Sequence, residues 1–228
     1  MMKRMKLHSL FAVLALTAAP FAAWAGTVQV TVVGVDGKPA PDTVVLLQPT
    51  ASWTPQPLPE PVVIAQKETR FVPYVTVVPI GATVRFTNRD SFDHHVRSQP
   101  GGPLGSVPPA KQFEFRLARV KGGVESSAEL KMDVAGSVLL GCHIHNSMRG
   151  HLFVSNTPWF AITDDDGHAT IHGAPEGQAE LRLWHPDQLV EQAPFKVQVS
   201  AATITADPRM NFNPRKRPPP PRKGEYEY

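Results

Sequence analysis

The 228-residue sequence predicts an all-β protein in which one β-sandwich is inserted in, or followed by, a smaller one. Short runs of alternating or β-branched apolar residues recur between Gly, Pro and Asp turns, which is typical of sandwiches and barrels. No segment keeps a 3.6-residue apolar period over the length of a helix. The 24 prolines argue against a helical bundle, and 42% apolar with only 19% charged residues argues against a wholly disordered chain.

Residues 1–25 have the order of a secretory signal. Basic residues precede an apolar stretch that starts at Leu10, and Ala23-Trp24-Ala25 forms an A-x-A motif before Gly26. Pro20 interrupts the apolar stretch, which is short for a membrane span; an uncleaved anchor is the alternative. We therefore expect an exported mature protein without a membrane span, located in the periplasm if the host is a Gram-negative bacterium.

The net charge of the chain comes from its two ends. Of 23 basic residues, three lie in residues 1–25 and six in residues 209–228, which leaves 14 basic against 18 acidic residues in 26–208. This stretch is therefore slightly acidic, and a nucleic-acid partner is not expected.

The candidate strands follow one another between turn signals. They are Thr27–Val33, Thr43–Leu47, Val62–Ala65, Tyr74–Val78, Ala82–Asn88, Phe113–Leu117, Ser137–Leu140, His151–Val154, Ala179–Trp184 and Phe195–Val199. Residues 49–61 hold five prolines and are expected to be a linker. Residues 209–228 mix prolines with cations and are expected to be a disordered tail, with a docking segment for a partner as the alternative.

The single cysteine lies in a cluster of possible metal ligands, GCHIHNSMRG, at residues 141–150. Cys142, His145 and Met148 follow the spacing C-x2-H-x2-M. A thiolate and an imidazole at this spacing on a tight loop can bind one ion from the same side, and the thioether can approach it axially. Cys, two His and a distant Met are the ligands of blue-copper electron-transfer sites. A second imidazole is available upstream, in residues 86–98.

A structural role for Cys142 is the competing interpretation, because a lone cysteine is usually a small buried apolar residue. An exported protein, however, exposes an unpaired thiol to oxidation, which favours a thiol with a function. One cysteine also excludes a disulfide scaffold, an iron–sulfur cluster and a multi-cysteine zinc site. His168, His172 and His185 are expected to be surface or packing residues.

The segment before the upstream histidine resembles the cupredoxin family, nearest to its amicyanin and plastocyanin branch. The family pattern F-x-P … V … G-x-x-V-x-F-x-N is matched by Phe71, Pro73, Val75, Val77, Gly81, Val84, Phe86 and Asn88. The family histidine comes six residues after the Asn, which is His94 here, and His94-His95-Val96 replaces His-Asn-Val. The short Cys-to-Met loop followed by Arg-Gly resembles amicyanin specifically. The resemblance covers about residues 62–155.

This resemblance implies a Greek-key β-sandwich with one type 1 copper ion. Its ligands would be His94, Cys142, His145 and Met148, and the Asn88 side chain would tie the two ligand loops together. No catalytic residue and no organic cofactor is implied.

Several residues depart from the family pattern. Gly141 stands where relatives have an aromatic residue, and the residues between His145 and Met148 are more polar than usual. His95, His143 and His151 add imidazoles that amicyanin lacks. Strand alternation places His94 and His95 on opposite faces, and the spacing from Asn88 favours His94 as the ligand. His143 or His151 could supply a fifth ligand or a second, weaker site.

Residues 27–47 and 159–184 resemble the carboxypeptidase-regulatory-like, or transthyretin-like, sandwich. The first reads as strand, DGKP turn and strand; the second as three strands separated by DDDG and PEG turns. We expect the N-terminal strands to pair with the C-terminal ones, so that the cupredoxin block is an insertion. The expected division is signal peptide (1–25), first flanking strands (26–48), Pro-rich linker (49–61), cupredoxin domain (62–156), remainder of the flanking sandwich (157–208) and tail (209–228).

The order of motifs is also similar to that of bacterial proteins labelled "methylamine utilization protein". The matching segments are Cys142–Met148, Thr157–Phe160, Thr163–Gly167 and Trp184–Pro186. That label reflects genomic context and does not establish a role in amine oxidation.

The function expected from the resemblance is one-electron transfer by a periplasmic copper protein, with a redox protein or enzyme as its transient partner. A copper enzyme or sensor with an open coordination position is one alternative, and a copper-binding or delivery module is another. A hydrolase is not expected, because a catalytic Cys–His pair needs a third side chain that orients the histidine base, and the thioether of Met148 cannot do so. The protein is thus more consistent with an electron carrier than with an enzyme.

Overall fold

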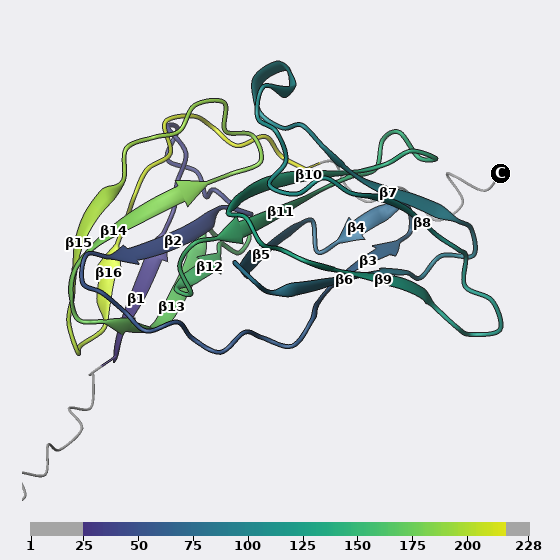
Figure 1. Cartoon of the computed structure of the whole chain (residues 1–228). Helices are drawn as coiled ribbons and strands as arrows, with labels where there is room; N and C mark the ends of the chain where they lie inside the picture. Colours follow the sequence, from purple (N-terminus) through teal and green to yellow (C-terminus); the bar gives the residue numbers. More distant parts are fainter. Residues whose placement is uncertain (1–24, 218–228) are drawn as a thin grey trace, which may run out of the picture.

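The computed structural model describes residues 25–217, and these form sixteen strands and one short 3-10 helix (Figure 1). The all-β prediction is confirmed. The strands are β1 (Ala25–Thr31), β2 (Val44–Pro49), β3 (Val62–Lys67), β4 (Arg70–Val72), β5 (Val75–Pro79), β6 (Thr83–Asn88), β7 (His94–Gln99), β8 (Glu114–Leu117), β9 (Ser126–Lys131), β10 (Gly136–Cys142), β11 (Arg149–Ser155), β12 (Phe160–Ile162), β13 (His168–Pro175), β14 (Gly177–Trp184), β15 (Phe195–Val199) and β16 (Ile204–Ala206); the 3-10 helix is η1 (Pro103–Gly105).

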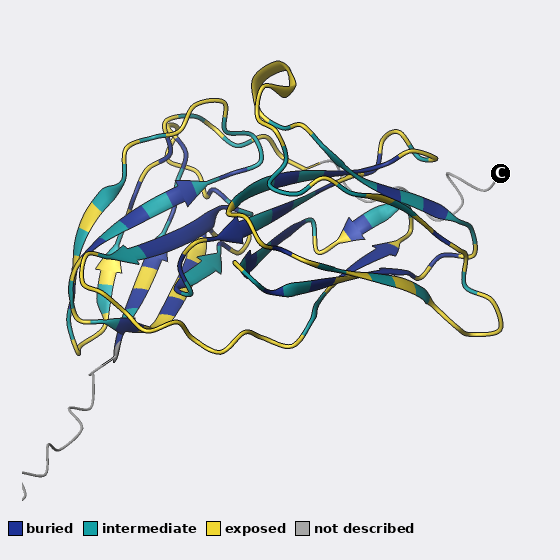
Figure 2. Cartoon of the chain, in the orientation of Figure 1, coloured by how far each residue is buried: buried dark blue, intermediate teal, exposed yellow. Residues whose placement is uncertain are grey.

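Nine of these strands form a first sandwich of two sheets. One sheet has the order β5-β11-β10-β7-β8 and the other the order β4-β3-β6-β9. Inward residues of both sheets form one apolar core: in β6, for example, Val84 and Phe86 are fully buried while Arg85 between them is exposed. This alternation is what a strand with one face on a core requires. Figure 2 shows buried and exposed residues alternating along the ribbons in this way.

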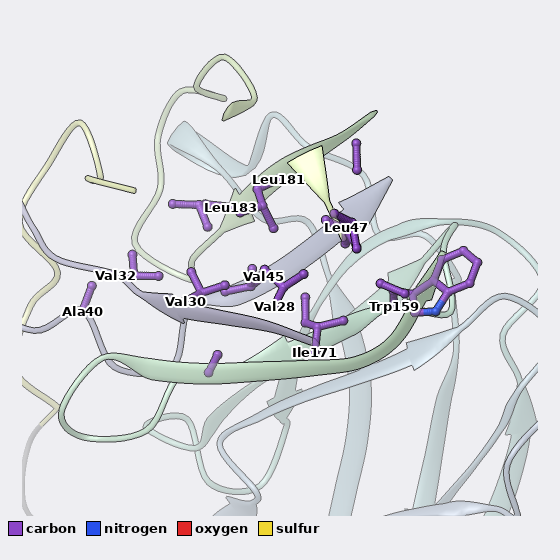
Figure 3. Packing of buried hydrophobic residues seen from close by; sticks show 14 of the residues in the cluster. Val28, Val30, Val32, Ala40, Val45, Leu47, Trp159, Ile171, Leu181 and Leu183 are labelled. Carbon is purple, nitrogen blue, oxygen red and sulfur yellow. The ribbon is translucent and has the colours of Figure 1, made fainter. Parts of the chain in front are cut away.

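The other seven strands form a second sandwich, with sheets ordered β13-β1-β16 and β12-β2-β14-β15. Its core is built from β-branched and leucine side chains that face one another across the two sheets, with Trp159 closing one end (Figure 3). Members labelled there include Val28, Val30, Leu47, Ile171 and Leu181.

Strands from the two ends of the chain meet in this second sandwich. β1 pairs with β13 and with β16, and β2 pairs with β12 and β14. The predicted contacts between residues 27–47 and 160–206 are therefore present. The stretch from 50 to 61, between β2 and β3, contains no strand. Strands β3 to β11 therefore form one segment of the sequence, and strands of the other sandwich precede and follow it. The exact domain boundaries stay a prediction.

The two sandwiches are joined by a third apolar cluster. Val44 and Leu46 of β2 and Val75 of β5 are buried at its centre. Partly buried aromatic residues surround them, and Phe153 of β11 lies against Trp184 of β14 with ring centroids 5.1 Å apart. Burial of these side chains ties the sandwiches to each other.

Part of the predicted tail is folded, so the prediction of disorder from Arg209 onward was wrong for residues 209–217. Met210 is only 1% exposed and belongs to the second core, and its backbone N–H donates to Val33 O. The backbone N–H and the guanidinium of Arg215 both donate to the carboxylate of Asp187. Met210 and Phe212 pack on the second core, and Arg215 and Arg217 pair with carboxylates, so both apolar and polar contacts hold this stretch. Residues 218–228 lie outside the described residues.

The expected signal peptide, apart from Ala25, also lies outside the described residues. Between residues 25 and 217, no helix has the length and apolar character needed to cross a membrane. Four short or polar strands, β4, β7, β9 and β16, are absent from the predicted set, because they lack a run of apolar residues.

Gly150 offers a test of how tightly the first core is packed. A Cβ placed at Gly150 would lie 2.6 Å from Cβ and 2.9 Å from Cγ of Phe71, whose side chain is 2% exposed. Because the buried ring cannot move aside freely, we expect Gly150→Ala to lower the free energy of unfolding by about 1–3 kcal/mol, measured by denaturant titration.

Gly101→Ala is the matched control for that variant. A Cβ at Gly101 meets nothing within 4 Å. Its free energy of unfolding should change by no more than about 1 kcal/mol. Equal losses in the two variants would contradict the packing argument.

Candidate metal centre

The loop with the predicted ligands joins two paired strands of the first sandwich. Cys142 is the last residue of β10, and β11 begins at Arg149. The loop between them is tight: Met148 N–H donates to His145 O (2.9 Å), and Arg149 Nη1 donates to Asn146 O (2.7 Å). The antiparallel pairing of β10 with β11 thus fixes both ends of the loop.

The upstream histidine reaches this loop because β7 pairs with β10. The two strands are antiparallel, and Val96 lies opposite Cys142. His94, the first residue of β7, therefore stands beside the end of β10 and faces the core, where its side chain is fully buried. His95 follows on the other face of the sheet, so the alternation expected for this pair is confirmed.

Three of the four predicted ligands converge. Sγ of Cys142 lies 3.6 Å from Nδ1 of His94 and 3.5 Å from Nδ1 of His145. One ligand atom from each residue lies within 4.8 Å of the other two. Cys142 is 1% exposed and His145 is half-buried, so the group has one side near the surface. A ring of Phe92 packs beside both imidazoles, at centroid distances of 5.3 Å from His94 and 5.2 Å from His145.

Met148 ends the same loop and is buried, at 2% exposure. It belongs to the core cluster that also contains Cys142. Its thioether is thus part of the apolar surroundings of the thiol.

Hydrogen bonds favour the thiolate form of Cys142. Burial alone would raise the pKa of the thiol. Three contacts act against burial: the hydrogen bond with His94, the backbone N–H of His95 at 3.4 Å from Sγ, and the hydrogen bonds with His145. Together they lower the pKa of the Cys142 thiol to about 6. Because thiolate is the form that binds metal, the cysteine is prepared as a ligand near neutral pH.

Asp90 is a functional residue that the sequence analysis missed. Its Oδ2 accepts a hydrogen bond from Nε2 of His94 at 2.8 Å, which leaves Nδ1 of that ring directed at Cys142. A carboxylate in this position fixes the tautomer and orientation of a ligating imidazole. The same carboxylate accepts the backbone N–H groups of Glu68 and Thr69, so the β3–β4 turn anchors it.

The pKa values of this pair follow from their contact. Burial alone would lower the pKa of His94, but the hydrogen bond from its ring to Asp90, and then its contact with Cys142, raise it. Burial likewise would raise the pKa of Asp90, but His94 and the two backbone N–H donors hold it below its usual range. Asp90 is therefore an ionised carboxylate at neutral pH.

Asn88 does not do what the resemblance implied. Its Nδ2 donates to the carbonyl oxygens of Phe92, Leu117 and Ala118, and its Oδ1 accepts the N–H of Asp90. The Asn88 side chain therefore links residues 88–92, which precede His94, to the end of β8 and not to the 143–148 loop. The prediction that it bridges the two ligand loops was wrong, because the end of β8 fills that position.

The additional histidines have other surroundings. His151 lies at the junction of the two sandwiches, where Nε2 is 3.2 Å from the Tyr74 hydroxyl and the ring packs near Trp184. Burial lowers the pKa of His151 to about 4, so it is neutral at pH 7. His95 and His143 face outward together with Glu114.

The donor set fits a soft, redox-active metal ion. Two imidazole nitrogens and a thiol meet at a largely buried position, and a sulfur ligand with imidazoles favours copper over hard cations. This group of described residues contains no carboxylate, whereas Mg²⁺ and Ca²⁺ prefer oxygen ligands.

Comparisons with known proteins return only distant structural likenesses. No protein-family model matches the chain, and no curated protein matches it in sequence. A Cu-containing nitrite reductase (NirK) from Thermus scotoductus SA-01 superposes with a TM-score of 0.36 at 24% identity, over 48% of this chain and 26% of the reductase. This chain therefore spans about a quarter of the reductase.

Amicyanin mutants superpose on a similar share of the chain. The reduced state of one has a TM-score of 0.32 at 24% identity, and the oxidized form of another has 0.33 at 22% identity; each covers 42% of this chain and 82% of the amicyanin. TM-scores this low add nothing to the assignment of the site, which rests on the ligand geometry.

The thiol pKa can be tested on the metal-free protein. In His94→Gln, the thiolate loses a hydrogen-bond partner worth about 1.5–3 kcal/mol to a charged group, so the pKa of Cys142 should rise by about one to two pH units. The measurement is thiolate ultraviolet absorbance as a function of pH, with circular dichroism to verify the fold. His168→Gln, on β13 of the other sandwich, should leave the midpoint in place. An unchanged midpoint in His94→Gln would show that the ring does not stabilise the thiolate.

Proposed function

We propose that this chain is an exported type 1 copper protein that carries single electrons between redox partners in the periplasm. The observation that carries the proposal is the convergence of His94, Cys142 and His145 within 4.8 Å at a largely buried position. Met148 would be the axial ligand. The expected signal in residues 1–25 supports export.

Copper bound there would supply a one-electron couple between Cu(I) and Cu(II). The chain's contribution is to hold the ligands in one arrangement. The paired ends of β7, β10 and β11 place the three ligating groups, and Asp90 fixes the ring of His94. The backbone N–H of His95 donates to Sγ of Cys142 and limits its movement. A site whose ligands are held by strands and hydrogen bonds needs little rearrangement when the charge of the ion changes.

His145 provides the path for electrons to the surface. It is the least buried of the three converging ligands and lines an open hollow of about 640 Å³. Ile144 beside it is 51% exposed, and the hollow also has a basic rim. The residues lining it are Phe92, Asp93, Arg116, Ala118, Arg119, Lys121, Ile144 and His145. Such a surface suits brief contact with a partner that presents acidic groups around an apolar centre.

The same hollow favours a second candidate function, a copper enzyme or small-molecule sensor. A ligand of small size could reach the ion beside His145 if a coordination position were open. Spin-resonance evidence of an exchangeable water on Cu(II) would support this candidate, whereas a closed site would support the electron carrier.

Loading the mature protein with Cu(II) tests the proposal directly. We expect an intense visible absorption from charge transfer between Cys142 and Cu(II), together with the narrow spin-resonance splitting of a type 1 site. Cys142→Ser should abolish the visible band, and His168→Ala should retain it. A copper-loaded wild-type protein without colour would refute the proposal.

Met148→Leu tests the axial ligand separately. Leucine keeps the volume but replaces the thioether by an alkyl group, which makes the surroundings of the ion less polar and so disfavours the more highly charged Cu(II). The reduction potential should therefore rise while the visible band is retained. Protein-film voltammetry gives the potential, and Met132→Leu, a buried methionine of the same core, is the control. Equal potentials in all three proteins would exclude Met148 from the copper site.

A further inference from the structure

A second group of metal-binding side chains lies on the outer face of the same sheet. It consists of His95, Glu114 and His143, called here the outer cluster, and one ligand atom from each lies within 4.8 Å of the other two. Oε1 of Glu114 is 3.2 Å from Nε2 of His95 and 3.6 Å from Nδ1 of His143. None of these side chains belongs to the ligand set of the buried centre.

Strand alternation produces the outer cluster. His94 and Cys142 face the core, so the next residue of each segment, His95 and His143, faces solvent. His143 N–H donates to His95 O at 3.0 Å, which continues the β7–β10 pairing by one residue. Their rings stack, with centroids 5.4 Å apart and planes inclined by 16°.

The third member comes from the neighbouring strand. Glu114 begins β8 and pairs with Arg97, two residues from His95 on the same face of β7. A residue in this diagonal position is within reach of a long side chain. The three ligand residues thus stand on adjacent parts of one sheet: His95 in β7, Glu114 in β8 and His143 directly after the end of β10.

We propose that the outer cluster binds a divalent transition-metal ion of the zinc or copper(II) type. Two imidazoles and one carboxylate are a common ligand set for Zn²⁺, and imidazole also suits Cu²⁺. The side chains are 31%, 53% and 57% exposed for His95, Glu114 and His143. An ion can therefore bind between the Glu114 carboxylate and the two rings, in place of their present direct contacts, without disturbing the core. Water can complete the coordination of the ion.

The outer cluster is chemically distinct from the buried centre on the other side of the strands. The buried centre has a thiolate and selects a soft ion, whereas the outer cluster has only nitrogen and oxygen donors. One residue links the two, because the backbone N–H of His95 donates to Sγ of Cys142. This second site goes beyond the proposed electron-carrier function and does not require it.

Zinc titration of the mature protein, as wild type and as Cys142→Ser, provides the test, because the copper-free thiolate centre can itself bind Zn²⁺. Isothermal calorimetry with ZnCl₂ gives the affinity and stoichiometry, and NMR of the histidine ring protons reports which imidazoles bind. We expect the resonances of His95 and His143 to shift together on addition of Zn²⁺. His143→Ala and Glu114→Gln should each weaken this binding event by at least about tenfold, since even the loss of a residue that only supports a ligand costs about 10–100-fold.

Two controls separate this site from the buried centre. His168→Ala removes an exposed histidine on β13 and should leave the binding event unchanged. Cys142→Ser should remove the visible copper band yet keep zinc binding at His95 and His143, while His143→Ala should keep the band. If wild type, His143→Ala and Glu114→Gln bind zinc with the same affinity and stoichiometry, the outer cluster is not a metal site. A missing copper band with zinc binding retained would refute only the electron-carrier proposal.

Discussion

The pairing of β7 with β10 is the constraint on which the candidate centre depends. It sets Val96 opposite Cys142, and so brings His94 to a thiol 48 positions further along the chain. Cys142 and His145 share a short loop and would lie near each other in many folds. The second imidazole has no such local cause. A shift of one residue in this register would turn His94 to solvent and bring His95 inward, because side chains alternate along a strand.

A chain of buried polar contacts supports that register. Asp90 accepts hydrogen bonds from the β3–β4 turn and from His94, and His94 in turn contacts Cys142. The turn residues Glu68 and Thr69 both have positive φ, at 53° and 55°, which directs their N–H groups to one carboxylate. The carboxylate oxygens of Asp90 and the ring nitrogens of His94 all have partners in this network, as a site in an apolar core requires. The two sheets of the first sandwich are thereby joined at the ligands.

Features with local spacing could be predicted from the residues themselves, whereas His94, whose place depends on register, was predicted only through the family resemblance. The spacing of Cys142 and His145 on one loop and the alternation of His94 and His95 are both local, and the structure has Cys142 beside His145 and His94 and His95 on opposite faces. Asp90 was missed because a carboxylate four residues before a histidine has no recognisable meaning outside a helix. Glu114 was missed since its place beside His95 is set by the β7–β8 register. Composition misled at Met210, whose burial depends on a surface formed by distant strands.

The three additional histidines, His95, His143 and His151, lie in two different surroundings. His151 is on β11, one strand beyond Cys142, but it points to the junction of the two sandwiches, where Tyr74 and Trp184 surround it. Burial there keeps the His151 ring neutral, and the nearby His185 lowers its pKa further. His95 and His143 instead share a solvent-facing side with a carboxylate. One sheet thus separates a soft-ligand interior from a nitrogen–oxygen exterior, and the separation follows from nothing more than strand alternation and the packing of a second sandwich against β5 and β11.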